Sequence, residues 1–178
     1  MTTDIAERHG TITEAGTIVF ERLLPGPIER VWEYLTDPEK RGLWLASGPM
    51  EQRVGGAVEL NFRNSDLSPV HEAPPAKYKD AACASVKCQV TACEKPRLLA
   101  YLWGGEGSEV TFELSQAGDK VRLTLTHRRL PNRDFMLSVA GGWHTHLGIL
   151  ADRLAGNTPG PFWSTHAALE REYDQRIS

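Results

Sequence analysis

Apolar and polar residues alternate along several stretches of this chain, and this period of two predicts β-strands with one buried face. The alternation is clearest where threonine and glutamate separate Val110, Phe112 and Leu114. The Gly55–Gly56 pair supplies a turn before a second alternating stretch. Together with β-branched and apolar runs bounded by proline or glycine, these patterns predict strands over residues 17–24, 51–54, 58–62, 86–94, 98–103, 109–115 and 120–128.

The pattern changes to a helical period in three places, and the segment 133–155 shows it over the greatest length. On a helical wheel centred on Trp143, five other apolar side chains lie within about 40° of the centre. These residues are Met136, Val139, Leu147, Leu150 and Leu154. A helix with so narrow an apolar stripe is expected to cover the dry face of the sheet. Pro27 begins a shorter amphipathic helix, and Asp37–Pro38 signals the start of a second short one.

The remaining segments set the expected organisation of the chain. Residues 1–16 are expected to form an arm, in which Thr11–Thr13 pairs at a sheet edge, ahead of a domain spanning 17–156. Residues 157–178 are expected to be a helical extension packed on that domain, with its helix over 164–177. Between 64 and 85 lies a proline-rich stretch without period, and loops of this length are usually functional or mobile.

Composition narrows the classes of protein that this chain can represent. It has 178 residues, 24% of them charged, and a formal net charge of −3, with no basic cluster longer than Arg128–Arg129. We therefore expect no nucleic-acid partner. The longest apolar run, residues 98–103, is far below the roughly 20 residues of a membrane helix, so no membrane association is expected. Cys83, Cys88 and Cys93 are too widely spaced for a zinc knuckle and odd in number, which favours a reducing, cytoplasmic location without a metal or cofactor.

His127 is the most informative candidate for chemistry. Continuing the alternation of Val121, Leu123 and Leu125 places His127 on the dry face of the sheet, at a strand end. Two interpretations remain open: a core histidine satisfied by neighbouring polar groups, or a polar group that contacts a ligand.

Aromatic and histidine side chains elsewhere add candidates. Trp44 and Trp103 end a helix and a strand and are expected to wall a pocket mouth, while Trp143 lies where the long helix would form the pocket floor. His144 and His146 point about 200° apart on a helix, so they cannot chelate one ion, although either can reach a cavity rim. The chain has no nucleophile elbow and no phosphate-binding glycine loop, so an enzymatic role is left open but is not favoured.

The order of several short motifs over residues 17–155 resembles one known family. Each motif is weak alone, but their order and spacing are specific. The motifs are Pro27, Val31–Trp32, Leu35–Pro38, Trp44, Gly55–Gly56, Pro96–Trp103, Ser108–Leu114, Gly118–Asp119, Leu123–His127, Gly142–Trp143, Leu147, Leu150 and Leu154. The chain is thereby similar to the Aha1-type branch of the START-like (SRPBCC) superfamily.

This resemblance implies an α+β helix-grip fold, in which a curved antiparallel sheet holds a long C-terminal helix and leaves a hollow for an apolar small molecule. It does not by itself select one activity. We expect an apolar or aromatic ligand bound by His127, Trp103, Trp44, Trp143, His146, Phe112 and Leu125. A cyclase-like or hydrolase-like enzyme and an Hsp90-activating co-chaperone remain alternatives. The 64–85 loop, the extra terminal helix and the lack of a separate N-terminal domain weigh against the co-chaperone, and the chain is expected to be a monomer or a homodimer.

Overall fold

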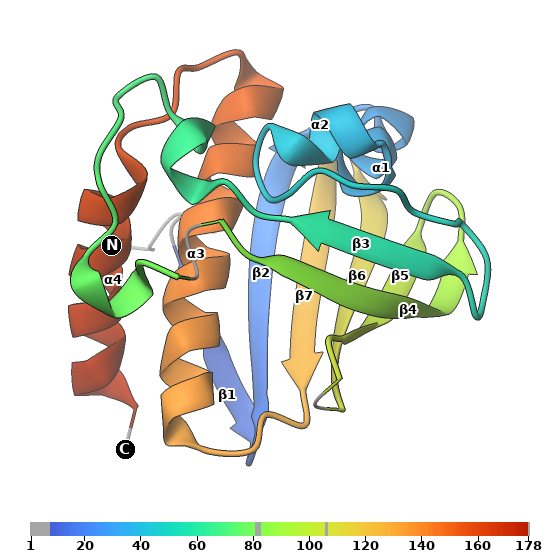
Figure 1. The fold of residues 1–178 in the computed structure, drawn as a ribbon. Helices are drawn as coiled ribbons and strands as arrows, with labels where there is room; N and C mark the ends of the chain where they lie inside the picture. The colour runs from blue at the N-terminus through green and yellow to red at the C-terminus, as the bar shows by residue number, and fades with distance from the viewer. Residues whose placement is uncertain (1–7, 81–82, 106, 178) are drawn as a thin grey trace.

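The computed structural model describes residues 8–80, 83–105 and 107–177, and these form one curved antiparallel sheet wrapped around a long helix (Figure 1). Within these ranges the sheet has seven strands in the order β1-β2-β7-β6-β5-β4-β3. The strands are β1 (Thr11–Glu14), β2 (Thr17–Pro25), β3 (Ala57–Asn61), β4 (Ser85–Glu94), β5 (Leu98–Trp103), β6 (Ser108–Ala117) and β7 (Lys120–Arg128). The helices are α1 (Ile28–Thr36), α2 (Pro38–Gly42), α3 (Arg133–Ala155) and α4 (Phe162–Arg176). The expected α+β helix-grip architecture is confirmed.

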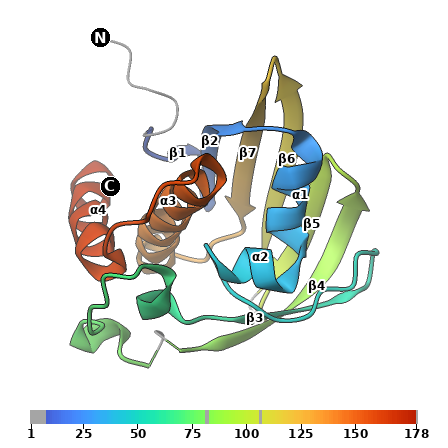
Figure 2. The same cartoon turned by 90° about the horizontal axis from the view of Figure 1, so that it is seen from above.

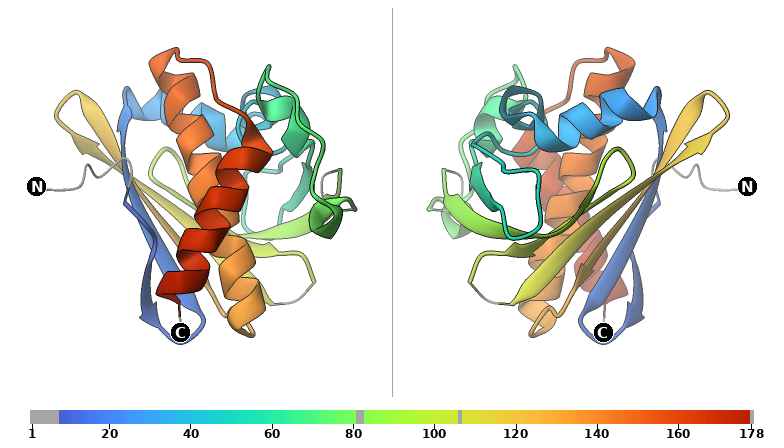
Figure 3. Two further views of the ribbon diagram at one scale, coloured as in Figure 1. Left: turned by 90° about the vertical axis from the view of Figure 1, so that its left-hand side faces the viewer. Right: turned by 90° about the vertical axis from the view of Figure 1, so that its right-hand side faces the viewer.

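Strand register explains which side chains face the inside of the curved sheet. His127 of β7 lies opposite Ile18 of β2 and Val110 of β6, and all three are fully buried. Two residues further along, Leu125 lies opposite Phe20 and Phe112. The alternation of the sequence therefore places His127 on the concave face. Figure 3 shows this concave face curving around α3 from both sides.

Helices α1 and α2 close one end of the concave face, as Figure 2 shows from above. The expected start of the second helix is confirmed, since the Asp37 carboxylate accepts hydrogen bonds from the backbone N–H groups of Glu39 and Lys40, both at 3.0 Å. After α2, the chain is held by Arg41, whose buried guanidinium donates to backbone carbonyls that include those of Ala46 and Glu59. This arrangement fixes the segment that carries Trp44 and Leu45.

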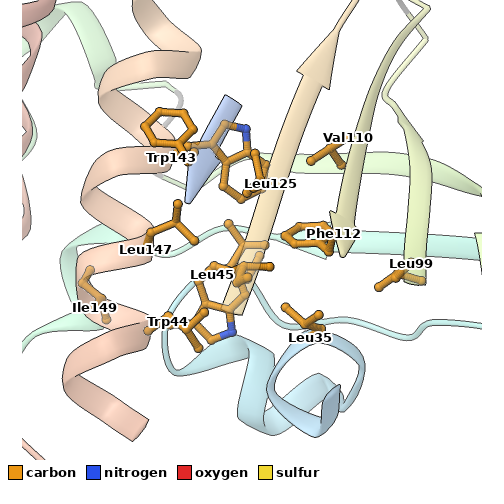
Figure 4. Packing of buried hydrophobic residues seen from close by; sticks show 14 of the residues in the cluster. Leu35, Trp44, Leu45, Leu99, Val110, Phe112, Leu125, Trp143, Leu147 and Ile149 are labelled. Carbon is orange, nitrogen blue, oxygen red and sulfur yellow. The ribbon is translucent and has the colours of Figure 1, made fainter. Parts of the chain in front are cut away.

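Most of the space between the sheet and α3 is filled by large apolar side chains. Trp143 and Leu147 reach from α3 toward Leu125 and Phe112 on the sheet, as Figure 4 shows. The Trp143 and Phe112 rings meet edge to face at a centroid distance of 5.7 Å. Trp44 closes the layer from the α2 side and is completely buried. The sheet and helix thus form one continuous core, with limited room left inside it.

Helix α4 lies alongside α3, on the side away from the sheet (Figure 2). The two helices approach closely at Gly141, where an added Cβ would lie 3.6 Å from His166 Nε2. The terminal helix expected over 164–177 is observed over Phe162–Arg176. No helix in the described ranges has the length and apolar character needed to cross a bilayer.

The loop expected from 64 onward runs across to α4 and contains two short 3₁₀ turns, η2 (Asn64–Leu67) and η3 (Ala76–Tyr78). We call residues 62–80 the strap. The Trp163 indole N–H donates to Ser65 Oγ at 2.9 Å, and the Tyr78 ring stacks on that of Trp163 at 5.7 Å. Tyr78 and Lys77 both bind the Glu170 carboxylate. The strap is therefore docked against α4 along much of its length.

Candidate ligand cavity

A cavity of about 140 Å³ remains between the sheet and α3, near the C-terminal ends of β5 and β7. Its wall combines aromatic rings, two histidines and a stretch of α3 that carries small residues. The lining residues are Leu45, Phe62, Trp103, His127, Ser138, Val139, Gly142, Trp143 and His146. Within the described ranges, no acidic residue, lysine or arginine belongs to this lining, so the cavity suits an uncharged ligand.

The volume of the cavity limits the size of any ligand it holds in this conformation. Pockets for drug-sized molecules usually enclose about 300–1,000 Å³. An engineered apolar cavity of about 150 Å³ in another protein binds benzene. At about 140 Å³, this cavity matches a single aromatic ring.

Both ring nitrogens of His127 are used inside the protein. The Trp143 indole N–H donates to His127 Nδ1 at 3.0 Å, so the neutral ring carries its proton on Nε2. That Nε2–H donates to Ser108 Oγ, at 3.1 Å. His127 has 0% exposure, and burial lowers its pKa to about 4, so the ring is neutral at pH 7. It contributes ring surface to the cavity wall rather than a free polar atom.

His146 is bonded through only one of its ring nitrogens. Its Nδ1 lies 2.8 Å from the Trp44 carbonyl oxygen, which can only accept, so Nδ1 carries the proton. Burial lowers the pKa of His146 to about 4, although the bond to Trp44 opposes this shift. The neutral ring therefore has an unshared electron pair on Nε2, and no group in the described ranges hydrogen-bonds to it.

The aromatic part of the wall is held by ring-to-ring contacts. Trp103 packs edge to face on Trp143 at 5.4 Å, and its centroid lies 5.7 Å from that of His127. Phe62, the first residue of the strap, lines the cavity, and its ring centroid lies 6.0 Å from that of Trp103 and 6.1 Å from that of His146. These contacts join β5, β7, α3 and the strap around one small volume.

Four of the seven residues expected to bind a ligand line this cavity, namely His127, Trp103, Trp143 and His146. The other three, Trp44, Phe112 and Leu125, are almost completely buried in the core and lie outside the lining. The Trp44 indole N–H is used internally, because it donates to the Tyr34 carbonyl at 2.6 Å. Trp44 reaches the cavity indirectly, through the carbonyl that orients His146.

Sequence reasoning missed five lining residues: Leu45, Phe62, Ser138, Val139 and Gly142. A signal for part of this set was present in the sequence. Ser138 and Gly142 precede His146 by eight and four residues, so a helix brings them to the same face as His146. Leu45 gave no such signal, because its position depends on the turn that Arg41 holds.

His144 faces a different region, as the helical geometry predicts. Its Nδ1 lies 2.8 Å from the Tyr173 hydroxyl, and the ring borders a wider groove of about 590 Å³ between α3 and α4. This groove also contains the carboxylates of Asp152 and Glu172, of which Glu172 is paired with His9. Among the residues that the structure describes, no cluster of three metal-ligating side chains is present.

Comparison with known proteins places this geometry in context. The family model described as "Activator of Hsp90 ATPase homolog 1-like protein" matches residues 25–155. No curated protein matches the chain.

Solved structures show the same fold. A Bordetella parapertussis protein determined by solution NMR is 47% identical over 99% of this chain and 96% of its own, with a TM-score of 0.81. CalU16 from Micromonospora echinospora is 22% identical over 89% of this chain and 86% of its own, with a TM-score of 0.64 in its crystal structure. The Aha1 dimer from Colwellia psychrerythraea is 18% identical over 78% of this chain and 95% of its own, with a TM-score of 0.59.

Proposed function

Because the chain belongs to the family of activator of Hsp90 ATPase homolog 1-like proteins, we propose that it binds a small apolar or aromatic molecule between its sheet and α3. The observation that carries this proposal is the uncharged cavity walled by Trp103, Trp143 and Phe62, in a core that is otherwise filled. A folded protein usually fills such space with side chains, because each empty volume costs packing energy. A cavity lined by aromatic rings and an unpaired acceptor is therefore more consistent with a ligand site than with a core.

Affinity for a purely apolar ring is expected to be weak. Burial of about 300 Å² of apolar ligand surface at about 25 cal/mol per Å² contributes about 7 kcal/mol. Association itself costs about 4 kcal/mol or more. A screen for ligands must therefore reach millimolar concentrations, and polar contacts are needed for tighter binding.

The proposal is tested by NMR titration of the ¹⁵N-labelled protein with single-ring compounds. Binding in the cavity is expected to shift the indole N–H resonances of Trp103 and Trp143, the latter being bonded to His127. The indole resonance of Trp32, which is bonded to Gln52 at 3.2 Å and lies outside the cavity, serves as an internal control. Shifts confined to the α3–α4 groove, or no saturable shift at millimolar ligand, would contradict the proposal.

The enzymatic alternative has less support from the geometry. A general acid or base works best with a pKa near the operating pH, whereas the pKa values of His127 and His146 are both lowered to about 4. His127 also has no free nitrogen for proton transfer to a substrate. A turnover assay whose rate depended on His127, with a pKa near 7, would favour the enzyme.

The co-chaperone alternative draws support from the family description and from the Aha1 protein of Colwellia psychrerythraea. It requires a surface that contacts Hsp90, and the cavity would then serve only the fold. An ATPase assay with purified Hsp90 separates the two functions. Stimulation that persists when the cavity is filled by substitution would favour the co-chaperone.

A further inference from the structure

The polar groups around the cavity restrict the chemistry of its ligand more closely than size alone. Resting on the binding function proposed above, we infer that the cavity selects a neutral single ring bearing one hydroxyl group, with His146 Nε2 as the acceptor for the hydroxyl proton. Phenol is the simplest molecule of this class. The inference depends on hydrogen-bond pairing, charge and volume, each of which excludes other ligand classes.

One acceptor on the cavity wall is left without a hydrogen-bond partner among the described residues. The Trp44 carbonyl fixes the proton of His146 on Nδ1, which leaves Nε2 with its electron pair. The other histidine of the wall has both nitrogens paired, and the Trp143 N–H is paired with it. Nε2 of His146 is thus an acceptor on the cavity wall that a ligand donor can pair with, in place of water.

The donors that remain on the wall favour a hydroxyl over other donor groups. The Trp103 indole N–H and the Ser138 hydroxyl have no hydrogen-bond partner in the described parts of the chain. A hydroxyl group donates one bond and accepts others, so one oxygen can satisfy Nε2 and receive a bond from the wall. An ether can accept but cannot donate, and it would leave Nε2 unpaired.

Charge excludes acids and amines of the same size. Among the described residues, no basic side chain lines the cavity to neutralise a carboxylate, and the electron pair of His146 Nε2 would repel it. No acidic side chain in the described parts of the chain lines it to neutralise an ammonium group. Burying an ion without a partner costs far more than one hydrogen bond returns. The ligand is therefore neutral, and the volume of about 140 Å³ limits it to one ring.

The test compares phenol, toluene and anisole by NMR titration of the wild-type protein. Phenol and toluene have equal numbers of non-hydrogen atoms, and only phenol can donate. Phenol is expected to bind about five- to tenfold more tightly than toluene and anisole, the gain from one well-placed hydrogen bond. Equal or tighter binding of toluene would overturn the inference while leaving the proposed binding function intact. Failure of all three to bind would overturn both.

Two variants assign the preference to one residue. His146→Leu is expected to abolish the preference for phenol and to retain toluene binding. His144→Leu alters the same helix but faces the α3–α4 groove, so it is expected to keep the preference. Retention of the preference in His146→Leu would overturn the assignment.

The role of His146 can also be tested by NMR in the wild-type protein, so this test does not depend on whether a variant folds. The Nε2 resonance of His146 in wild-type protein should begin at the shift of an unprotonated nitrogen, and phenol should move it upfield as the nitrogen accepts a bond. Toluene should leave it unchanged. An Nε2 that is already protonated without ligand would overturn the inference, because no acceptor would then be available.

Discussion

Gly142 offers a perturbation in which stability and ligand binding are expected to change in opposite directions. It lies inside α3 on the cavity wall, and a Cβ built there meets no atom within 4 Å. Gly148 lies in the same helix with an equally open Cβ position, but it borders the α3–α4 groove. The two glycines therefore form a matched pair, one inside the proposed site and one outside it.

Replacement of either glycine by alanine should stabilise the helix. Gly in a helix interior costs about 0.5–1 kcal/mol relative to Ala, because it loses more backbone entropy on folding. For a chain of this length, 1 kcal/mol raises Tm by about 2–4 °C. Gly142→Ala and Gly148→Ala should each show an increase of this size, measured by thermal unfolding followed by circular dichroism.

Ligand binding should separate the two variants. The methyl group of Gly142→Ala enters a volume that one ring would fill, and overpacking of this kind costs about 1–3 kcal/mol. The dissociation constant of phenol should therefore rise about five- to 150-fold, while Gly148→Ala keeps the wild-type value. Unchanged binding by Gly142→Ala would refute the placement of the ligand. A lower Tm for Gly142→Ala alone would refute the claim that the space is open.

Three further predictions follow from buried or docked groups. Arg22 has 1% exposure, its Nε and Nη2 have no partner in the described residues, and burial lowers its pKa. The substitution Arg22→Met should therefore raise the free energy of unfolding by about 1–4 kcal/mol. A lower urea midpoint for the variant would contradict this prediction. His127 and His146 have pKa values lowered from 6.5 to about 4, so the unfolded chain binds protons first as the pH falls. The lowered pKa of each histidine therefore removes up to about 3 kcal/mol from the free energy of unfolding as the pH falls from 6.5 to 4. Urea midpoints that do not change with pH across that window would show that the rings are not held neutral. Tyr78→Ala removes the ring stack on Trp163, so it should speed amide hydrogen exchange in the strap while leaving Tm nearly unchanged. A wild-type exchange pattern in this variant would argue against docking of the strap.

The sequence was sufficient to predict the strands and the long helix that form the helix-grip fold. Alternation over 120–128 placed His127 on the concave face, and the observed register confirms this position. The stripe around Trp143 predicted α3 with the bounds that the structure shows. Both successes come from periodicity, which records local burial directly.

The site was less predictable, because it depends on contacts between distant segments. The sequence suggested His127 as the polar anchor, but its partners Trp143 and Ser108 lie 16 and 19 residues away. Which histidine keeps a free nitrogen depends on the Trp44 carbonyl, 102 residues from His146. The volume of the cavity depends on how closely rings from four elements pack, and no local pattern encodes that quantity.

The docking of α4 also bears on how the protein should be shortened for expression. The family model ends at 155, but Phe162 at the start of α4 packs 5.2 Å from the His146 ring, between centroids. A truncation at that boundary would leave α3 with an uncovered apolar side and would expose the strap residues that normally rest on Trp163. Large uncovered apolar surfaces promote self-association. We therefore expect recombinant fragments ending near residue 155 to be poorly behaved, even though they retain every strand of the sheet.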